Sequence, residues 1–275
     1  MASVWSYEGT KCVVTGGGGA GMGAAVVKEL SNLGAEIHVL DLREPPVEVA
    51  SYQNVDLLDP DATAKAIDGI GGDVDALFNC AGLPGSKFPD LDVMLVNFAS
   101  MRWLAELCAR QMSSGAAICN ISSTAGAAYL QNIEKWMPLV MTESFEDAKE
   151  WCEANGDAIK GGYSPSKEAV CVWTMYASLS YAERGIRLNS ICPGPTDTPM
   201  MPDFENEASP DIINLFARGL GRRSTPEEQA YPMIFLNSRA ASYVSGENVN
   251  TDGGTITSMA TGQLTLDLSV LPQQQ

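Results

Sequence analysis

The chain has 275 residues, 45% of them hydrophobic, a length that suits one large α/β domain as well as two small ones. The 34 acidic and 17 basic side chains give a formal net charge of −17, which disfavours binding to nucleic acid and to anionic membranes. No apolar stretch is long enough for a membrane span, and residues 1–6 lack a basic region before an apolar run, so we expect a cytoplasmic protein.

Strands and helices alternate along the chain. Apolar runs predict strands at residues 12–14, 37–40, 54–57, 75–79, 116–121, 187–192 and 247–251. Apolar residues near helical spacing predict helices from Met22 onward and at residues 60–70, 91–112, 163–183 and 226–237. Asp59 is expected to cap the second helix. This alternation predicts an α/β fold with a doubly wound parallel sheet and helices on both faces.

The segment between Ser123 and Tyr163 is longer than a minimal α/β plan requires. It holds an apolar run at residues 136–141 and a short amphipathic helix at about 144–154. Long insertions in compact domains are usually functional or form interfaces, so we expect either a wall of a substrate pocket or an oligomer contact. We expect one domain over residues 1–275, with this insertion at about 125–160 and a partly mobile C-terminal tail from about 255.

A glycine-rich run from Thr15 to Gly23 separates the first strand from the first helix. Glycines let the backbone approach a pyrophosphate, and the helix N-terminus offers N–H groups and a positive dipole end. Asp41 ends the next strand, 20 positions after Gly21, where a carboxylate can bind the adenosine ribose and repel a 2′-phosphate. The joint pattern predicts an NAD site rather than a flexible loop beside a surface acid. Arg43 lies nearby in the sequence and could bind a 2′-phosphate, so NADP is the alternative cofactor.

A second constellation combines a tyrosine, a lysine and a serine. Tyr163 and Lys167 are four apart and share a helix face, and Pro165 between them places both in the first turn. Ser123 follows a strand whose carboxyl end faces the crevice where ligands bind. The ordinary pKa of a tyrosine is about 10, and a nearby ammonium and a positive nicotinamide ring lower it. A serine hydroxyl can donate a hydrogen bond to the substrate oxygen and stabilise its developing charge. These residues predict hydride-transfer chemistry, although an isolated pair of this spacing is usually a solvated helix face.

The remaining chemistry-bearing residues argue against a metal centre. His38 is the only histidine and falls in a predicted strand, which disfavours a histidine metal site and a Ser-His-Asp triad. The seven cysteines contain no C-x-x-C pair and lie mostly in apolar runs, so we expect buried free thiols and no metal.

Taken together, the motifs resemble the short-chain dehydrogenase/reductase family over residues 11–254. The resemblance rests on Asn-Cys-Ala-Gly at 79–82, Val-Asn at 96–97, Ser-Ser at 122–123, Tyr-Ser-Pro-Ser-Lys at 163–167, the Pro-Gly loop at 193–200 and Asp-Gly-Gly at 252–254. The glycine loop holds one residue more than the family pattern. The long connection before Tyr163, with residues 221–223 and 241–246, is most similar to the bacterial 3α-hydroxysteroid dehydrogenase/carbonyl reductase branch.

The resemblance implies a single Rossmann-type sheet and a four-residue relay. Tyr163 is the acid/base, Lys167 lowers its pKa and holds the nicotinamide ribose, Ser123 orients the substrate oxygen, and Asn97 links Lys167 to solvent through water. The lengthened loop leaves open which glycine of residues 16–19 contacts phosphate. The implied cofactor-binding residues are Gly16, Gly19, Gly21, Met22, Gly23, Asp41, Leu42, Asp56, Leu57, Asn79, Ala81, Gly82, Tyr163, Lys167, Pro193, Gly194, Thr196 and Thr198.

The expected function is NAD-dependent interconversion of a secondary alcohol and a ketone on a bulky hydrophobic substrate, first a hydroxysteroid or bile acid. A terpene or aryl alcohol dehydrogenase is the alternative within the family, and a non-catalytic NAD-binding regulator is the alternative from another class. The resemblance also implies a homodimer or homotetramer paired through the helices that start near residues 91 and 163. Candidate pocket residues are Leu83, Pro84, Trp136, Met137, Met141, Met200, Met201 and Phe204. Candidates for binding a ligand carboxylate are Arg102, Arg218, Arg222 and Arg223.

Overall fold

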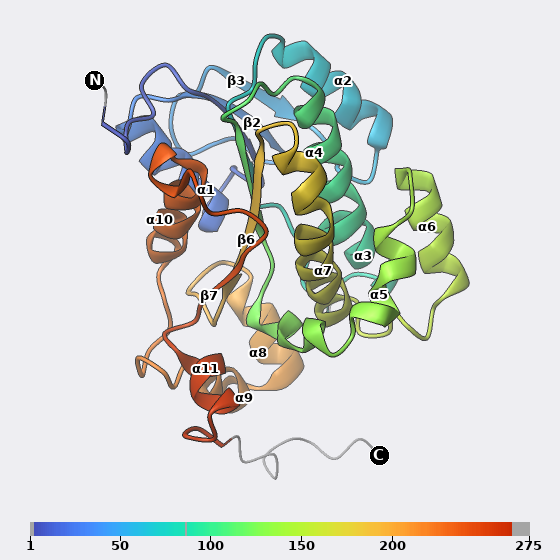
Figure 1. Cartoon of the computed structure of the whole chain (residues 1–275). Coiled ribbons are helices and arrows are strands. Elements are labelled where there is room, and N and C mark those ends of the chain that lie inside the picture. Colours follow the sequence, from blue (N-terminus) through green and yellow to red (C-terminus); the bar gives the residue numbers. More distant parts are fainter. Residues whose placement is uncertain (1–2, 86, 266–275) are drawn as a thin grey trace.

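A computed structural model describes residues 3–85 and 87–265, and its centre is a seven-stranded parallel sheet. The strand order is β3-β2-β1-β4-β5-β6-β7, and all neighbours pair in parallel (Figure 1). The order reverses between β1 and β4, and ligands bind at this point in doubly wound sheets. The predicted doubly wound sheet is therefore confirmed.

The strand positions follow the sequence prediction except at one edge of the sheet. The predicted third strand at residues 54–57 is wrong, because the observed strand ends at Asn54 and is partly exposed, so it lacks a continuous apolar run. Val55 and Leu57 are buried, but they lie in the loop after the strand and pack into the core below it. The strands are β1 (Lys11–Thr15), β2 (Glu36–Asp41), β3 (Ser51–Asn54), β4 (Ala76–Asn79), β5 (Ala117–Ile121), β6 (Arg187–Pro193) and β7 (Asn248–Thr251).

Helices cover both faces of the sheet. Successive residues of β1 point to opposite faces, so Val13 joins one buried cluster and Cys12 and Val14 join the other. The first cluster lies under α2 (Pro60–Ile70), α4 (Met101–Arg110) and α7 (Tyr163–Ala182). The second lies under α1 (Met22–Asn32) and α10 (Pro226–Asn237), which pack against each other (Figure 1).

The helix predicted at residues 91–112 is continuous but not uniform. It comprises α3 (Asp90–Met94), a π-helical turn at Leu95–Ser100, and α4. The π turn carries Asn97, and such turns occur often at functional sites. The expected cap of α2 is confirmed, because Asp59 Oδ1 accepts a hydrogen bond from the Ala62 N–H at 2.9 Å.

The inserted segment forms three short helices beside α7: a 3₁₀ helix at Thr124–Leu130, α5 (Ile133–Val140) and α6 (Phe145–Ala154) (Figure 1). Arg102 fastens it to α4, since its guanidinium donates to the carbonyl oxygens of Thr142 at 2.8 Å and Ser144 at 2.6 Å. The apolar run inside it is part of the core, and Trp136 is fully buried there.

The last group of helices lies beyond the carboxyl ends of the strands. It comprises α8 (Met201–Ala208), α9 (Pro210–Leu215) and α11 (Thr255–Ala260), and a 3₁₀ helix at Arg239–Ala241 precedes β7 (Figure 1). The expected tail thus begins with a helix, and its residues 266–275 lie outside the described part of the chain.

All seven cysteines are free and six are buried, with Cys80 partly exposed. Within residues 3–85 and 87–265, no helix is both long and apolar enough to cross a membrane.

Candidate active site

The glycine loop forms a bulge that is fastened to the loop after β2. Gly16 and Gly19 both have φ of +66°, a conformation that favours glycine. The Gly18 N–H donates to Asp41 Oδ2 at 2.8 Å, and the Gly19 N–H donates to the Glu44 carbonyl at 3.0 Å. The extra residue of this loop therefore turns two N–H groups toward β2 rather than toward α1.

The start of α1 fits a pyrophosphate. The helix begins at Met22, and Gly21 at its N-cap provides no side-chain cap, so the first-turn N–H groups can bind an anion. A Cβ atom on Gly23 would lie only 2.1 Å from the Gly16 carbonyl oxygen. Glycine at this position thus lets the helix approach the loop closely enough to form the cradle.

A carboxylate and a guanidinium lie together beside this loop. Asp41 Oδ1 accepts a hydrogen bond from the Arg43 N–H at 2.9 Å. The Arg43 guanidinium lies over Gly19, with Cζ 3.1 Å from the position of a Cβ atom there. Both groups are therefore near the site expected for the adenosine ribose. The other residues predicted here lie in the loops after β2 and β3 at the same sheet edge: Leu42, Asp56 and Leu57.

Tyr163 begins α7 and lies close to both predicted partners. Burial raises its pKa to about 12, and a hydrogen bond with Ser123 acts in the opposite direction. The Lys167 Nζ lies 5.4 Å from the centre of the tyrosine ring and donates to the Ile121 carbonyl at 2.9 Å. Burial lowers the pKa of Lys167 to about 8. Burial is therefore the largest influence on both pKa values, and it raises that of the phenol and lowers that of the ammonium.

The two adjacent serines have different surroundings. Ser122 is buried and donates to the Lys167 carbonyl at 2.8 Å, whereas Ser123 caps the following 3₁₀ helix by accepting the Ala125 N–H at 3.1 Å. The Ser123 hydroxyl is the one that reaches Tyr163.

Asn97 connects the loop after β4 to α7. Its Oδ1 accepts the Leu83 N–H at 2.7 Å, and its Nδ2 donates to Ser166 Oγ at 3.1 Å. Ser166 in turn donates to the Tyr163 carbonyl at 2.6 Å. Gly82 lies between Asn97 and Lys167, since a Cβ atom on it would lie 3.2 Å from Asn97 Oδ1 and 3.8 Å from the lysine Nζ. The structure thus brings all four residues of the predicted relay together.

A cavity of about 530 Å³ opens beside Ser123 and Tyr163. Its lining is mostly apolar and includes Met200, Met201 and Phe204, as predicted, and the Phe204 ring centre is 4.9 Å from that of Tyr163. The other predicted pocket residues do not line it. Trp136 is buried in the core and Met141 is exposed, because α5 turns its apolar side toward α7 rather than toward the cavity. The others that do not line it are Leu83, Pro84 and Met137.

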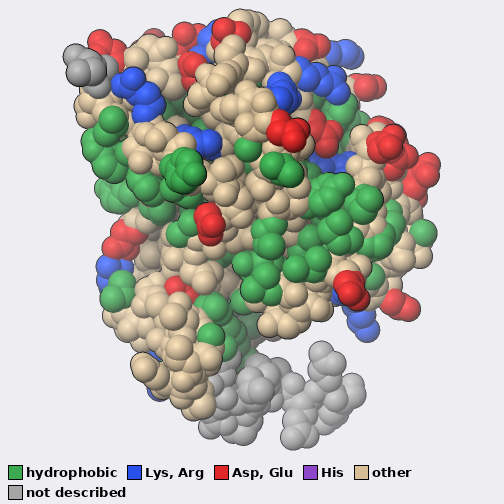
Figure 2. Space-filling view, viewed as in Figure 1, with side chains coloured by type: hydrophobic (Ala, Val, Ile, Leu, Met, Phe, Trp, Pro, Cys, Tyr) green, Lys and Arg blue, Asp and Glu red, His purple; other side chains and the backbone are tan. Residues whose placement is uncertain are grey.

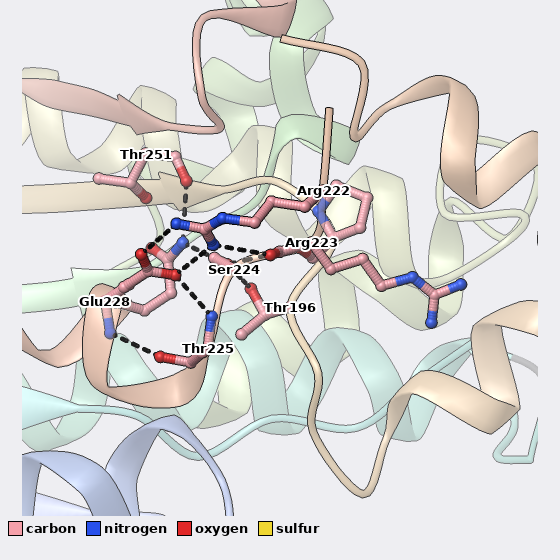
Figure 3. A network of polar contacts seen from close by, with 9 residues as sticks. Thr196, Arg222, Arg223, Ser224, Thr225, Glu228 and Thr251 are labelled. Atoms are coloured by element: carbon pink, nitrogen blue, oxygen red, sulfur yellow. Dashed lines mark hydrogen bonds and ion pairs between the residues drawn. The ribbon is translucent and has the colours of Figure 1, made fainter. Parts of the chain in front are cut away.

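Two predicted cofactor residues direct their side chains elsewhere. Asn79 is buried and donates to Asn120 Oδ1 at 2.9 Å and to the Met101 carbonyl at 3.2 Å. The Thr196 hydroxyl lies 2.9 Å from Ser224 Oγ (Figure 3). Thr196 nevertheless lines the cavity together with Pro193, Gly194 and Thr198 of the Pro-Gly loop, and Ala81 lies beside Gly16.

The arginines predicted as carboxylate ligands are engaged in other contacts or lie elsewhere. Arg222 forms an ion pair with Glu228 at 2.6 Å, and Glu228 also completes the capping box of α10 with Thr225 (Figure 3). Arg223 pairs with Glu205 at 2.6 Å. Arg102 is fastened to the insertion and Arg218 is exposed, so among the described residues that line the cavity none of the four arginines is found.

The charged residue of the cavity lining, Glu207, was missed from the sequence, as were apolar lining residues such as Ile212 and Phe216. Glu207 lies on α8, three positions after Phe204, and its charge raises the pKa of Tyr163. A helix predicted over residues 200–207 would have placed Glu207 on the same face as Met200 and Phe204, since these residues are three and four positions apart. Among the described residues, no cluster of three or more histidine, cysteine or acidic side chains is placed to hold a metal ion.

Comparisons with known proteins agree with this geometry. A family model described as short chain dehydrogenase matches residues 11–135, and one described as enoyl-(acyl carrier protein) reductase matches residues 153–256. The 3-alpha-hydroxysteroid dehydrogenase/carbonyl reductase of Comamonas testosteroni is 32% identical, with 88% of this chain and 95% of that protein covered. The coniferyl-alcohol dehydrogenase of a Pseudomonas strain is 28% identical, with 89% and 96% covered. The structure of the 3-alpha-hydroxysteroid dehydrogenase from Pseudomonas sp. B-0831 with NADH has a TM-score of 0.75 and 26% identity, with 94% of this chain and 100% of that chain covered.

Proposed function

Since the chain belongs to the short-chain dehydrogenase/reductase family, we propose that it interconverts a bulky hydrophobic secondary alcohol and its ketone with NAD(H). The observation that carries this proposal is that Ser123 and Tyr163 line one cavity, with Lys167 buried beside the Tyr163 ring and a glycine loop nearby. The chain is thus an oxidoreductase of this family that acts on alcohols or ketones and uses a nicotinamide cofactor.

The proposed roles follow from the contacts of each side chain. The bound cofactor would supply or accept the hydride. In oxidation, the Tyr163 phenolate would accept the hydroxyl proton of the substrate, and in reduction the phenol would return it. Ser123 would donate to the substrate oxygen, and Lys167 would hold the nicotinamide ribose and lower the Tyr163 pKa once the cofactor is bound. Asn97 would hold a water beside Lys167.

We propose NAD as the preferred cofactor, with NADP as the alternative. The support is the Asp41 carboxylate, whose charge would repel a 2′-phosphate near the bulge of the glycine loop. The nearby Arg43 guanidinium is the feature that favours NADP. Relatives of known structure include one solved with NADH and one with bound NADP, so the chain's own residues must carry the argument.

We propose a hydroxysteroid or bile acid as the substrate, and an aryl or terpene alcohol as the alternative. The cavity of about 530 Å³ is shared with residues implied for the cofactor, and the apolar side chains of Met200, Met201 and Phe204 in it support a bulky hydrophobic substrate. The hydroxysteroid dehydrogenases among the relatives support the first class, and the coniferyl-alcohol dehydrogenase supports the second.

The proposal also covers the oligomeric state of the protein. We propose a homodimer or homotetramer in which α7 contributes to pairing, because α7 exposes Met175, Tyr176 and Leu179. Figure 2 shows hydrophobic side chains gathered over the face that carries α5 and α7.

The location and the domain organisation also remain proposals. Seven free thiols fit a reducing compartment such as the cytoplasm. We propose one domain with an insertion.

The test is a matrix of assays by nicotinamide absorbance. NAD and NADP are each combined with hydroxysteroids and bile acids that differ in hydroxyl position, and with terpene and aryl alcohols. We expect turnover of one steroid position with NAD. Turnover confined to aryl or terpene alcohols would support the alternative substrate class. NAD binding without turnover of any alcohol would contradict the proposal and favour a non-catalytic regulator.

A further inference from the structure

The charge around the substrate cavity is one-sided. Of the described residues that line the cavity, Glu207 is the one that carries a charge. The other lining side chains are apolar or are neutral hydroxyl groups such as those of Ser164 and Thr198. A substrate in this cavity thus meets one strong hydrogen-bond acceptor and no cation from the lining.

Glu207 lies at the rim of the cavity, where α8 approaches the loop after β4. A Cβ atom on Gly85 would lie 3.3 Å from Glu207 Oε1 and 3.3 Å from the Gly161 carbonyl oxygen. Phe204, one helical turn earlier, contacts the ring of Tyr163. Glu207 is exposed whereas Tyr163 is partly buried, so we expect the part of a substrate that projects from the cavity, away from the reacting hydroxyl at Tyr163, to pass the Glu207 carboxylate.

The groups around Glu207 do not neutralise it. Asp90 is the neighbouring charge that, together with partial burial, raises the pKa of Glu207, and its Oδ2 accepts the Gly161 N–H at 3.1 Å. Two basic side chains near α8 are paired with other acids: Lys87 lies 2.5 Å from Asp203, and Arg223 lies 2.6 Å from Glu205. The rim of the cavity is therefore negative.

We propose that Glu207 selects neutral substrates that carry a hydrogen-bond donor, such as a second hydroxyl, at the end remote from the reacting hydroxyl. Substrates with a carboxylate at that end are disfavoured, because like charges repel and the lining offers no cation to compensate. This inference rests on the proposed function. Within the proposed substrate class it favours steroid diols over bile acids.

A matched pair of substrates tests the proposal. Lithocholic acid and 5β-cholane-3α,24-diol share the ring system and the ring hydroxyl, and differ only in a terminal carboxylate or hydroxyl. Both are assayed with the wild-type chain, with Glu207→Gln, which keeps an acceptor but removes the charge, and with Glu207→Leu, which removes both. Asp211→Asn, on the neighbouring helix and outside the lining, is the control for a general change in surface charge.

We expect the wild-type kcat/KM to be about two- to fivefold higher for the diol, the size of an interaction at an exposed site. Because any change in the Tyr163 pKa acts on both substrates alike, the acid-to-diol ratio of kcat/KM is the readout: Glu207→Gln should raise this ratio about two- to fivefold. Glu207→Leu, which also removes the acceptor, should lower kcat/KM for the diol relative to Glu207→Gln. An acid-to-diol ratio that is the same in the wild type and in Glu207→Gln would overturn the proposal.

The proposed substrate class can fail separately from this selection. If neither steroid is turned over, the same ratio is measured with 1,4-benzenedimethanol and 4-(hydroxymethyl)benzoate, which differ in the same way. A preference for the neutral compound that Glu207→Gln removes would then support the selection and contradict the steroid. A ratio unaffected by Glu207→Gln would overturn the selection in that class as well.

Discussion

The indole Nε1 of Trp136 donates a hydrogen bond to Glu168 Oε2 at 2.6 Å, and the Asn132 side chain donates to the same oxygen at 2.7 Å. Trp136 lies on α5 of the inserted segment, while Glu168 follows Lys167 on α7. Trp136 also packs against Trp151 of α6, with ring centres 6.3 Å apart. The insertion is thereby fastened to the helix that carries Tyr163 and Lys167, which gives this part of it a supporting role rather than a place in the cavity wall.

Replacing Glu168 tests this attachment. Glu168→Ala leaves the buried indole N–H of Trp136 and the Asn132 amide without their acceptor, so the free energy of unfolding should fall by about 1–3 kcal/mol. Urea unfolding followed by tryptophan fluorescence measures the change. Glu183→Ala, at the exposed end of the same helix, is the control and should change stability by less than about 0.5 kcal/mol. Equal effects of the two variants would contradict the attachment.

The role of the tyrosine is tested by removing one oxygen atom. Tyr163→Phe keeps the ring that contacts Phe204 but removes the proton donor and acceptor, so kcat should fall about 100-fold or more. Calorimetric titration should show that NAD still binds. Tyr176→Phe, on the exposed side of the same helix, should retain activity. A Tyr163→Phe protein with full activity would rule out the proposed acid/base.

The sequence predicted most of the fold because buried parallel strands are continuous apolar runs. Val13 and Val14 of β1 are buried on opposite faces of the sheet, so the strand appears in the sequence as a continuous apolar run. The edge strand β3 has no such run, so the apolar residues after it were mistaken for the strand. The π-helical turn around Asn97 also left no signal, because it changes hydrogen bonding and not the pattern of buried residues.

The candidate site was predictable where motif spacing fixes the backbone, as it does for Tyr163 and Lys167. The direction of individual side chains was not predictable, because it depends on tertiary partners. Thr196 turns toward Ser224, and Trp136 enters the core, since each finds a hydrogen-bond partner there. Glu207 was overlooked because nothing local indicates that α8 closes one side of the cavity.

Cofactor preference should respond in opposite directions to the two charges beside the glycine loop. Asp41→Asn removes the charge that repels a 2′-phosphate, so the ratio of kcat/KM with NAD to that with NADP should fall about tenfold. Arg43→Ala removes the cation that favours the phosphate, and the ratio should rise. The kcat/KM of each variant with each cofactor gives the ratios, with Asp61→Asn on α2 as the control. A rise of the ratio in Asp41→Asn would show that Asp41 acts on the loop through Gly18 rather than on the cofactor.

The pH dependence of alcohol oxidation should report the surroundings of Tyr163. Oxidation requires the phenolate, so kcat/KM should rise with pH as the tyrosine loses its proton. The hydrogen bond from Ser123 lowers this pKa, whereas the charge of Glu207 raises it. Ser123→Ala should therefore move the rising limb to higher pH, and Glu207→Gln should move it to lower pH.

The opposite signs make this pair of variants a strict test. Bound NAD adds a positive charge and lowers the pKa in every variant, so the comparison concerns the shift between variants and not the midpoint of any one profile. The measurement is kcat/KM for oxidation against pH at a saturating concentration of NAD. Asp211→Asn, which also removes one negative charge but lies outside the cavity, should leave the profile in place. Shifts of the same sign in Ser123→Ala and Glu207→Gln would mean that the titrating group is not Tyr163, since these two neighbours act on its phenolate in opposite ways.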